Sequence, residues 1–395
     1  MFSLRQTTKA TSDPASPAPP GEQEALATNV EIATPSPSVD RPVGDHAVPA
    51  NTVVTLDHVV TVESLKSADA VDADTAKPEA RLTHAKAVEG SARSADGATS
   101  PWLMLPAQRN YRLYVPPHVA PRNGGDTLPL VVMVHGCRET AEEFERGTRM
   151  NTIADREGFA VLYPDQASFA NIRRCWNWFE ANTAAGNGEC AIILEMIREA
   201  RKHAKLDPTR VYVAGMSSGA AIAGLLAYHH PDTFAAVAMH SGLPPMMPPS
   251  ASAAISAMKK GVRVNGDLLA QMYWNTHNVL PPPLIVLHGD QDETVTERNA
   301  TSMVKLWEKL YETAPQANPL QRVETEIASA ENARSYSQID QQRDGRTVIS
   351  GLRIHGLAHL WSGGDASLPF NDAKGPVASE LIWKFFEGQQ RVRLS

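Results

Sequence analysis

DPTRVYVAGMSSGA, running from Asp207 to Ala220, is the stretch of sequence that decides the fold. Its first half contains a short apolar run typical of a buried strand, and its second half opens a helix. Between them the spacing Gly-X-Ser-X-Gly places Ser217 in a sharp turn, which would lift its hydroxyl above the edge of a sheet. Gly215 and Gly219 flank this serine because such a turn is crowded and strained. The stretch therefore predicts a nucleophilic serine at the carboxyl end of a strand.

Short apolar strands and amphipathic helices continue to alternate on both sides of this stretch. The expected strands cover residues 111–115, 128–134, 159–163, 210–214, 235–239, 283–287 and 347–354. The expected helices cover about residues 140–156, 188–204, 218–228, 296–312 and 373–387. This alternation predicts an α/β protein whose mostly parallel sheet carries helices on both faces. Two longer connections, 243–282 and 314–346, interrupt it, and the first could form either a lid or a pocket wall.

The first hundred residues differ in composition from the rest. Of the 7 Trp, 8 Tyr and 9 Phe residues, only Phe2 precedes position 101, and residues 1–100 hold 8 Lys and Arg against 14 Asp and Glu. With Phe2 as its single aromatic residue, this segment cannot bury enough apolar surface to offset the entropy lost on ordering. We therefore expect a disordered acidic tail over residues 1–100 and one catalytic domain over residues 101–395.

Charge and composition argue against several classes of partner. Residues 101–395 hold 29 Lys and Arg against 30 Asp and Glu, so they lack the basic surface that nucleic-acid binding needs. The sequence contains no run of 18 apolar residues, so it predicts no membrane span. Residues 1–30 lack the apolar run of a signal peptide. The sequence has three cysteines, and none of them has the CxxC spacing that suggests a zinc site. The sequence leaves the oligomeric state open.

A nucleophilic serine needs a base and an acid, which on such a sheet follow it in the order acid, then histidine. Asp290 and Asp292 follow the strand expected at 283–287, and His359 follows the last expected strand. Because the carboxyl ends of parallel strands share one edge, both loops should open beside Ser217. We favour Asp292 as the acid, because Asp290 is closer to its strand and suits a turn. Each residue alone fits a structural loop role; the order favours catalysis.

Acyl transfer also requires N–H donors for the oxyanion. The residue after the nucleophile, Ser218, offers one backbone N–H, and the loop after an earlier strand should offer the second. That loop contains His135, Gly136 and Cys137, so we assign the second donor to the backbone N–H of Cys137. This chemistry requires no metal ion and no organic cofactor.

At this point the sequence resembles the poly(3-hydroxybutyrate) depolymerase-type esterases, a family that includes feruloyl and acetylxylan esterases. The resemblance spans residues 109–386 and rests on ordered blocks: VHGC at 134–137, GFAVLYPDQ at 158–166, CWNWF at 175–179, DPTRVYVAGMSSGA at 207–220, HSGLP at 240–244, HGDQDETV at 288–295 and HLWSGG at 359–364. It implies an α/β-hydrolase fold with Ser217 as nucleophile, Asp292 as acid and His359 as base. Family members are often exported, which would make the protein extracellular.

Three tryptophans are candidates for substrate contact. Trp176 and Trp178 alternate in sequence, so on an extended segment they would share a face, and we expect one in the core and one in a pocket wall. We also assign Trp361, which follows His359 closely, to substrate binding. A further hypothesis is a disulfide between Cys137 and Cys175, which forms if their loops meet above the sheet edge.

The sequence therefore predicts a serine carboxylic-ester hydrolase that uses Ser217, His359 and Asp292. We expect short or soluble esters as substrates, such as hydroxyalkanoate oligomers or acetyl and feruloyl esters. The alternative is a non-catalytic interaction protein that keeps the hydrolase fold and binds a partner through its acidic tail.

Overall fold

The computed structural model describes residues 88–93, 108–117, 127–245, 248, 250–315, 318–328 and 333–391. All of them belong to one compact unit, His58–Ser395, and none to the other unit, Met1–Asp57. Most of the predicted tail over residues 1–100 therefore lies outside the described residues. Its exception is strand β1 (Val88–Arg93), which pairs antiparallel with β2 and which the sequence had not indicated.

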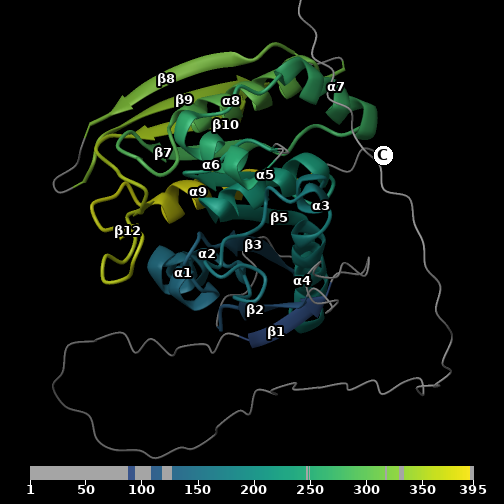
Figure 1. Cartoon of the computed structure of the whole chain (residues 1–395), viewed down its shortest axis with the longest axis vertical. Coiled ribbons are helices and arrows are strands. Elements are labelled where there is room, and N and C mark those ends of the chain that lie inside the picture. Colours follow the sequence, from purple (N-terminus) through teal and green to yellow (C-terminus); the bar gives the residue numbers. More distant parts are fainter. Residues whose placement is uncertain are drawn as a thin grey trace, which may run out of the picture. The chain divides into compact units, whose positions relative to one another are not determined.

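Ten strands of the described residues form one sheet in the order β1-β2-β4-β3-β5-β6-β7-β10-β9-β8, and Figure 1 shows it running from β1 at the bottom to β8 at the top. The neighbours from β4 to β10 in this order pair in parallel, and the outer pairs are antiparallel. The bounds are β2 (Gln108–Tyr114), β3 (Leu128–Val134), β4 (Ala160–Asp165), β5 (Leu206–Met216), β6 (Ala236–His240), β7 (Leu284–Gly289), β8 (Gln321–Ile327), β9 (Tyr336–Arg343) and β10 (Arg346–Ile354).

All seven strands expected from the sequence are present, and the mostly parallel α/β architecture is confirmed. The structure adds β8 and β9 inside the connection expected at 314–346. Strand β8 is exposed along nearly its whole length, so its sequence has no apolar pattern from which a strand could be predicted. Pairing with β9, rather than burial, holds it in the sheet.

The helices are α1 (Ala141–Thr148), α2 (Met150–Glu157), α3 (Ala181–Ala184), α4 (Glu189–His203), α5 (Ser218–His229), α6 (Ala251–Lys260), α7 (Gly266–Thr276), α8 (Arg298–Glu312) and α9 (Ala378–Glu387). The single helix expected at 140–156 is two helices, because Arg149 adopts a left-handed conformation (φ 55°) between them. Helix α5 was expected to be amphipathic, but it is apolar on nearly every side and buried from Ser218 to Tyr228. None of the described helices combines the length and apolar character that a membrane crossing requires.

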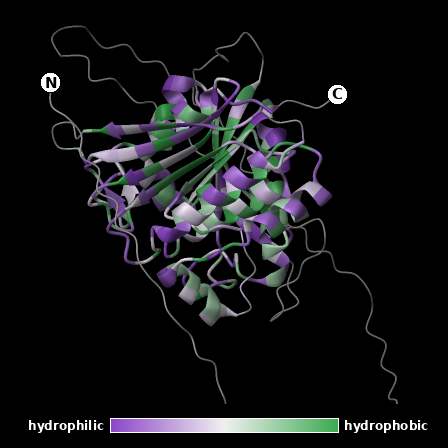
Figure 2. Cartoon of the chain, turned by 90° about the horizontal axis from the view of Figure 1, so that it is seen from above, coloured by the Kyte–Doolittle hydropathy of each residue, from purple (hydrophilic) through white to green (hydrophobic). Residues whose placement is uncertain are grey.

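Two hydrophobic cores lie on opposite faces of the sheet, because successive side chains of a strand point to opposite faces. Strand β3 shows the division: Leu130, Val132 and Val134 join one core, whereas Val131 and Met133 join the other. The first core includes side chains of α4 to α8, and the second includes those of α1, α2 and α9. Figure 2 shows the result, with hydrophobic strands inside and hydrophilic positions on the helices.

Candidate active site

The backbone around Ser217 is held in a turn that tolerates only glycine at two positions. Ser217 itself has φ 56°, and its N–H donates to the carbonyl of His240 over 3.0 Å. A Cβ atom on Gly215 would lie 2.3 Å from the carbonyl oxygen of Gly219, and one on Gly219 would lie 2.1 Å from that of Val134. Close packing of α5 on β3 and β5 thus explains both glycines of the motif.

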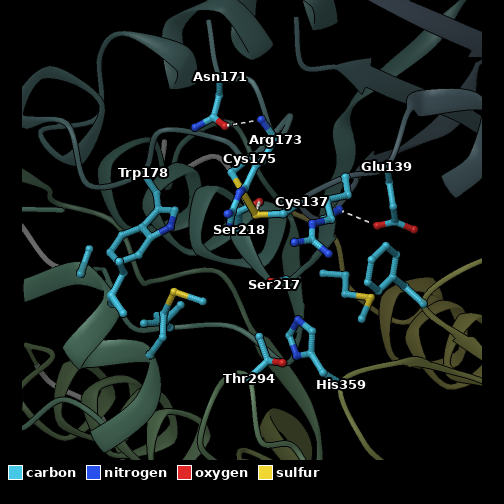
Figure 3. Close-up of a pocket in the computed structure, with 18 of the residues that line it drawn as sticks. Cys137, Glu139, Asn171, Arg173, Cys175, Trp178, Ser217, Ser218, Thr294 and His359 are labelled. Atoms are coloured by element: carbon cyan, nitrogen blue, oxygen red, sulfur yellow. Dashed lines mark hydrogen bonds between the residues drawn. A yellow bond between two sulfur atoms is a disulfide. The ribbon is translucent and has the colours of Figure 1, made fainter. Parts of the chain in front are cut away.

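A cavity of about 460 Å³ lies over this turn, and both Ser217 and His359 line it. Figure 3 shows the imidazole of His359 beside Ser217, on the side of the cavity opposite Arg173. Within the described residues no hydrogen bond joins the two side chains. The structure thus brings together the predicted nucleophile and base from β5 and from the loop after β10.

The side chain of Asp292 lies against His359 and is fully buried. Its Oδ2 atom is 2.7 Å from His359 Nδ1 and 3.4 Å from His288 Nε2, and its Oδ1 accepts the N–H groups of Thr294 and Val295. Burial alone would raise the pKa of Asp292, but the hydrogen bond and charge of His359 outweigh it and lower that pKa. The carboxylate is therefore ionised and oriented toward the imidazole.

Asp290, the other carboxylate considered from the sequence, serves the neighbouring loop instead. Its Oδ1 accepts the N–H of Gly356 over 2.7 Å, and its Oδ2 lies 3.1 Å from His355 Nδ1. It therefore fastens the end of β7 to the chain that leads to His359. This geometry matches the structural role expected for Asp290.

The two residues predicted to donate to the oxyanion line the same cavity. Cys137 and Ser218 both line it, and in the described part of the chain neither backbone N–H donates to a protein acceptor. Ser218 is the first residue of α5, so its N–H has no acceptor within the helix. The arrangement leaves two N–H groups free near Ser217.

The hypothesised disulfide between Cys137 and Cys175 is present. The hydroxyl of Ser218 lies 3.5 Å from Cys137 Sγ and accepts the N–H of Trp176 over 3.3 Å. Since a disulfide sulfur has no hydrogen, the hydroxyl is the donor in the first contact. The segment around Cys175 is thereby fixed beside the loop that follows β3.

Only one of the three predicted substrate-binding tryptophans lines the cavity. Trp178 does so, and Trp176 is fully buried in the core, in agreement with the expected division between the two. The assignment of Trp361 was wrong for this cavity. Its ring stacks on His240 with centroids 5.1 Å apart, and its Nε1 donates to Ser379, so β11 (Trp361–Ser362) turns it into the core beneath the site.

A buried polar network around Glu189 was not predicted from the sequence. The Glu189 carboxylate accepts from Arg109, from Gln166 Nε2 and from the backbone N–H of Asn177 over 2.6 Å to 3.0 Å. Gln166 also donates to the carbonyl of Cys175. These contacts anchor the segment that carries Trp178. The one signal in the sequence for this network was Glu189, a charged residue at the start of the otherwise apolar face of α4.

Three further residues with ionisable side chains line the cavity and were also missed: Arg138, Glu139 and Arg173. Glu139 is buried and accepts the N–H of Gly136 over 2.8 Å. Burial raises the pKa of Glu139 to about 8. Helix α6 contributes Ile255 and Met258 to the lining, so the first long connection supplies a pocket wall. In the described ranges no group of three or more His, Cys, Asp or Glu side chains is arranged to hold a metal ion.

Comparison with known proteins identifies sequence relatives. The chain is 35% identical to poly(3-hydroxyalkanoate) depolymerase C of Paucimonas lemoignei over 182 residues, which cover 45% of this chain and 44% of that protein. It is 28% identical to feruloyl esterase B of Neurospora crassa over 216 residues, covering 52% of this chain and 71% of that protein. A probable acetylxylan esterase A of Aspergillus fumigatus is 26% identical, with 50% and 54% covered. The chain thus spans about half the length of two of these relatives.

The fold has a known counterpart as well. Acetyl xylan esterase from Aspergillus awamori shares it with a TM-score of 0.53 and 19% identity, over 75% of this chain and 99% of that one. The described residues therefore have the α/β-hydrolase fold. Residues 109–317, more than half of the sequence, match the model of the family described as esterase PHB depolymerase. The chain belongs to the esterase PHB depolymerase family.

Proposed function

We propose that this protein hydrolyses carboxylic esters through an acyl-enzyme formed on Ser217. The observation that carries the proposal is the 2.7 Å contact between Asp292 and His359 at a cavity that Ser217 also lines. Family membership supports the reaction class, because the matched family is one of esterases. The free N–H groups of Cys137 and Ser218 supply the remaining requirement of acyl transfer.

Each step assigns a proton and a bond to a named atom. The Ser217 hydroxyl attacks the ester carbonyl while His359 Nε2 takes its proton, and the N–H groups of Cys137 and Ser218 stabilise the oxyanion. The carbon–oxygen bond to the alcohol then breaks as His359 returns the proton to the leaving oxygen. Water, deprotonated by His359, releases the acid from Ser217 in the same way. Asp292 holds the imidazole with Nδ1–H toward itself, which leaves Nε2 free to act as the base.

The substrates we propose are short or soluble esters. The relatives' names include a hydroxyalkanoate depolymerase, acetylxylan esterases and feruloyl esterases, so the acyl group varies across the family. The cavity is mainly apolar, with Trp178, Phe179, Leu243 and Met258 in its lining, and its volume of about 460 Å³ suits a small acyl group.

The decisive variant is Ser217→Ala. We expect at least about a 10⁴-fold loss of kcat for p-nitrophenyl butyrate, because no other group can form the acyl-enzyme. The matched control is Ser367→Ala, an exposed serine that does not line the cavity. Thermal unfolding of both variants separates a lost nucleophile from a lost fold.

A fluorophosphonate probe distinguishes the enzyme from a non-catalytic scaffold. An esterase should be labelled at Ser217, and labelling should disappear in Ser217→Ala. Retained turnover in that variant would refute Ser217 as the nucleophile. An unlabelled wild-type protein that turns over no ester would refute the proposal in favour of the interaction protein.

A further inference from the structure

Two arginines sit at the cavity on segments that are fastened to each other. Arg138 directly follows Cys137, and Arg173 lies two residues before Cys175, so the disulfide joins their neighbours. The backbone N–H of Arg138 also donates to the carbonyl of Arg173 over 2.7 Å. Both residues line the cavity and are exposed, which places them at its mouth. Figure 3 shows Arg173 on the same side as the disulfide.

Neither the Arg138 nor the Arg173 guanidinium has a partner among the described residues of the protein. In the described part of the chain, the guanidinium groups of Arg138 and Arg173 make no ion pair and no hydrogen bond; the N–H of Arg173 that donates to Asn171 Oδ1 belongs to the backbone. The adjacent Arg174 differs, because its Nη1 lies 3.6 Å from Asp165 and donates to the carbonyl of Gln166. The loop before Cys175 therefore contains Arg174, which binds other parts of the protein, and Arg173, which lines the cavity without a partner for its charge. Arg138, on the loop after β3, also lines the cavity without such a partner.

The rest of the lining does not neutralise these two charges. Glu139 is the only carboxyl group among the described residues of the lining, and its pKa of about 8 keeps it mostly protonated at neutral pH. The free N–H at the start of α5 adds the partial positive charge of a helix N-terminus. Residues 101–395 hold 29 Lys and Arg against 30 Asp and Glu, so a positive cavity is a local feature and not a general one.

We infer that the substrate of this site carries a free carboxylate, which Arg138 and Arg173 bind while its ester carbonyl lies at Ser217. The inference rests on the proposed ester hydrolysis and narrows its substrate class. Guanidinium groups match a carboxylate in shape and donate paired hydrogen bonds to it. Linear oligomers of hydroxy acids combine ester bonds with such a terminal carboxylate. Acetyl and feruloyl esters of a neutral polysaccharide have none near the scissile bond.

The test compares two substrates that differ only in charge. One is the linear dimer of 3-hydroxybutyrate with its free carboxylate, and the other is the same dimer with that group converted to the primary amide. Both contain the same internal ester, whose cleavage chromatography measures. We expect wild-type kcat/KM for the acid to exceed that for the amide by at least about threefold at low salt. The advantage should shrink as salt is raised, because exposed charges are screened.

Variants then assign the effect to the two arginines. Arg138→Gln and Arg173→Gln should each lower the acid-to-amide ratio of kcat/KM, and the double variant should bring it close to one. Arg322→Gln is the matched control, because it removes the same charge from an exposed position of β8, outside the cavity. It should leave the ratio unchanged. Thermal unfolding confirms that each variant is folded.

The outcomes separate this inference from the proposed function. Carboxylate recognition is overturned, and ester hydrolysis stands, if Ser217-dependent cleavage of the acid and of the amide dimer has the same kcat/KM. The same conclusion follows if both arginine variants keep the wild-type acid-to-amide ratio. Cleavage of p-nitrophenyl butyrate without cleavage of either dimer also overturns it. If none of the three esters is cleaved, the proposed function itself fails.

Discussion

At the scale of single residues, two neighbouring aspartates after β7 have different tasks. Asp292 contacts His359 over 2.7 Å, whereas Asp290 binds the N–H of Gly356 over 2.7 Å and contacts His355. Both have a lowered pKa, so ionisation does not distinguish them. Only the partner of each carboxylate does, and that partner lies more than sixty residues further along the chain.

This difference predicts unequal effects of the same substitution. Asp292→Asn should lower kcat by about 10³- to 10⁴-fold, because an amide favours the wrong tautomer of His359 and does not stabilise its charged form. Asp290→Asn should change kcat/KM by less than about tenfold, since its side-chain oxygen still accepts the N–H of Gly356. Equal losses in p-nitrophenyl butyrate hydrolysis would show that the two roles are wrongly assigned.

Glu139 couples the stability of the protein to pH. Its folded pKa of about 8 lies above the unfolded value of about 4.3, so between these values the folded protein binds more protons than the unfolded chain. Stability from this group is therefore greatest below the unfolded pKa and falls as the pH rises toward 8. The cause is burial of the carboxyl group beside the loop that carries Cys137.

Glu139→Gln should remove this dependence, because glutamine does not ionise but still accepts the N–H of Gly136. Urea unfolding between about pH 5 and pH 8 should show wild-type stability falling more steeply than that of the variant. Glu142→Gln, at an exposed position of the adjacent helix α1, is the control and should follow the wild type. Parallel curves for wild type and Glu139→Gln would contradict the elevated pKa.

At the scale of elements, the position of Ser217 depends on how closely α5 approaches the sheet. Gly219 lies so near β3 that a Cβ atom would overlap the carbonyl oxygen of Val134 at 2.1 Å. That neighbour is strand backbone, which cannot rotate away as a side chain would. Any side chain at this position must therefore push the helix and the serine turn off the sheet.

Gly219→Ala should accordingly lower the free energy of unfolding by roughly 3 kcal/mol and reduce esterase activity together with it. Gly388→Ala at the end of α9 is the matched control, since it has φ −82° and no atom within 4 Å of the added Cβ. It should leave stability within about 1 kcal/mol of wild type. Thermal and urea unfolding measure both, and a Gly219→Ala protein as stable as the control would refute the packing argument.

At the scale of the whole molecule, the candidate site is assembled from four separate loops. Cys137 follows β3, Ser217 follows β5, Asp292 follows β7 and His359 follows β10. These strands pair in parallel through β6, so their carboxyl ends share one edge of the sheet. The order of strands brings together residues that are 222 positions apart in the sequence, as between Cys137 and His359.

Much of this architecture could be predicted because the central strands are apolar on both faces. Strands β3, β5, β6 and β7 stand out as short apolar runs, and Gly-X-Ser-X-Gly marks the turn after β5. Elements without a local pattern could not be predicted. Strand β8 is exposed and polar, and Arg149 ends α1 in a left-handed conformation without glycine or proline to announce it.

The amino-acid pattern alone was enough to place an esterase-like serine at the end of a parallel strand, because apolar runs and turn glycines are local signals. Which groups line the cavity was a matter of packing between distant segments. Trp361 turns inward onto His240, Glu139 loses water beside Gly136, and the disulfide holds Arg138 and Arg173 together at the cavity. Such contacts depend on three-dimensional proximity, which no local run of residues encodes.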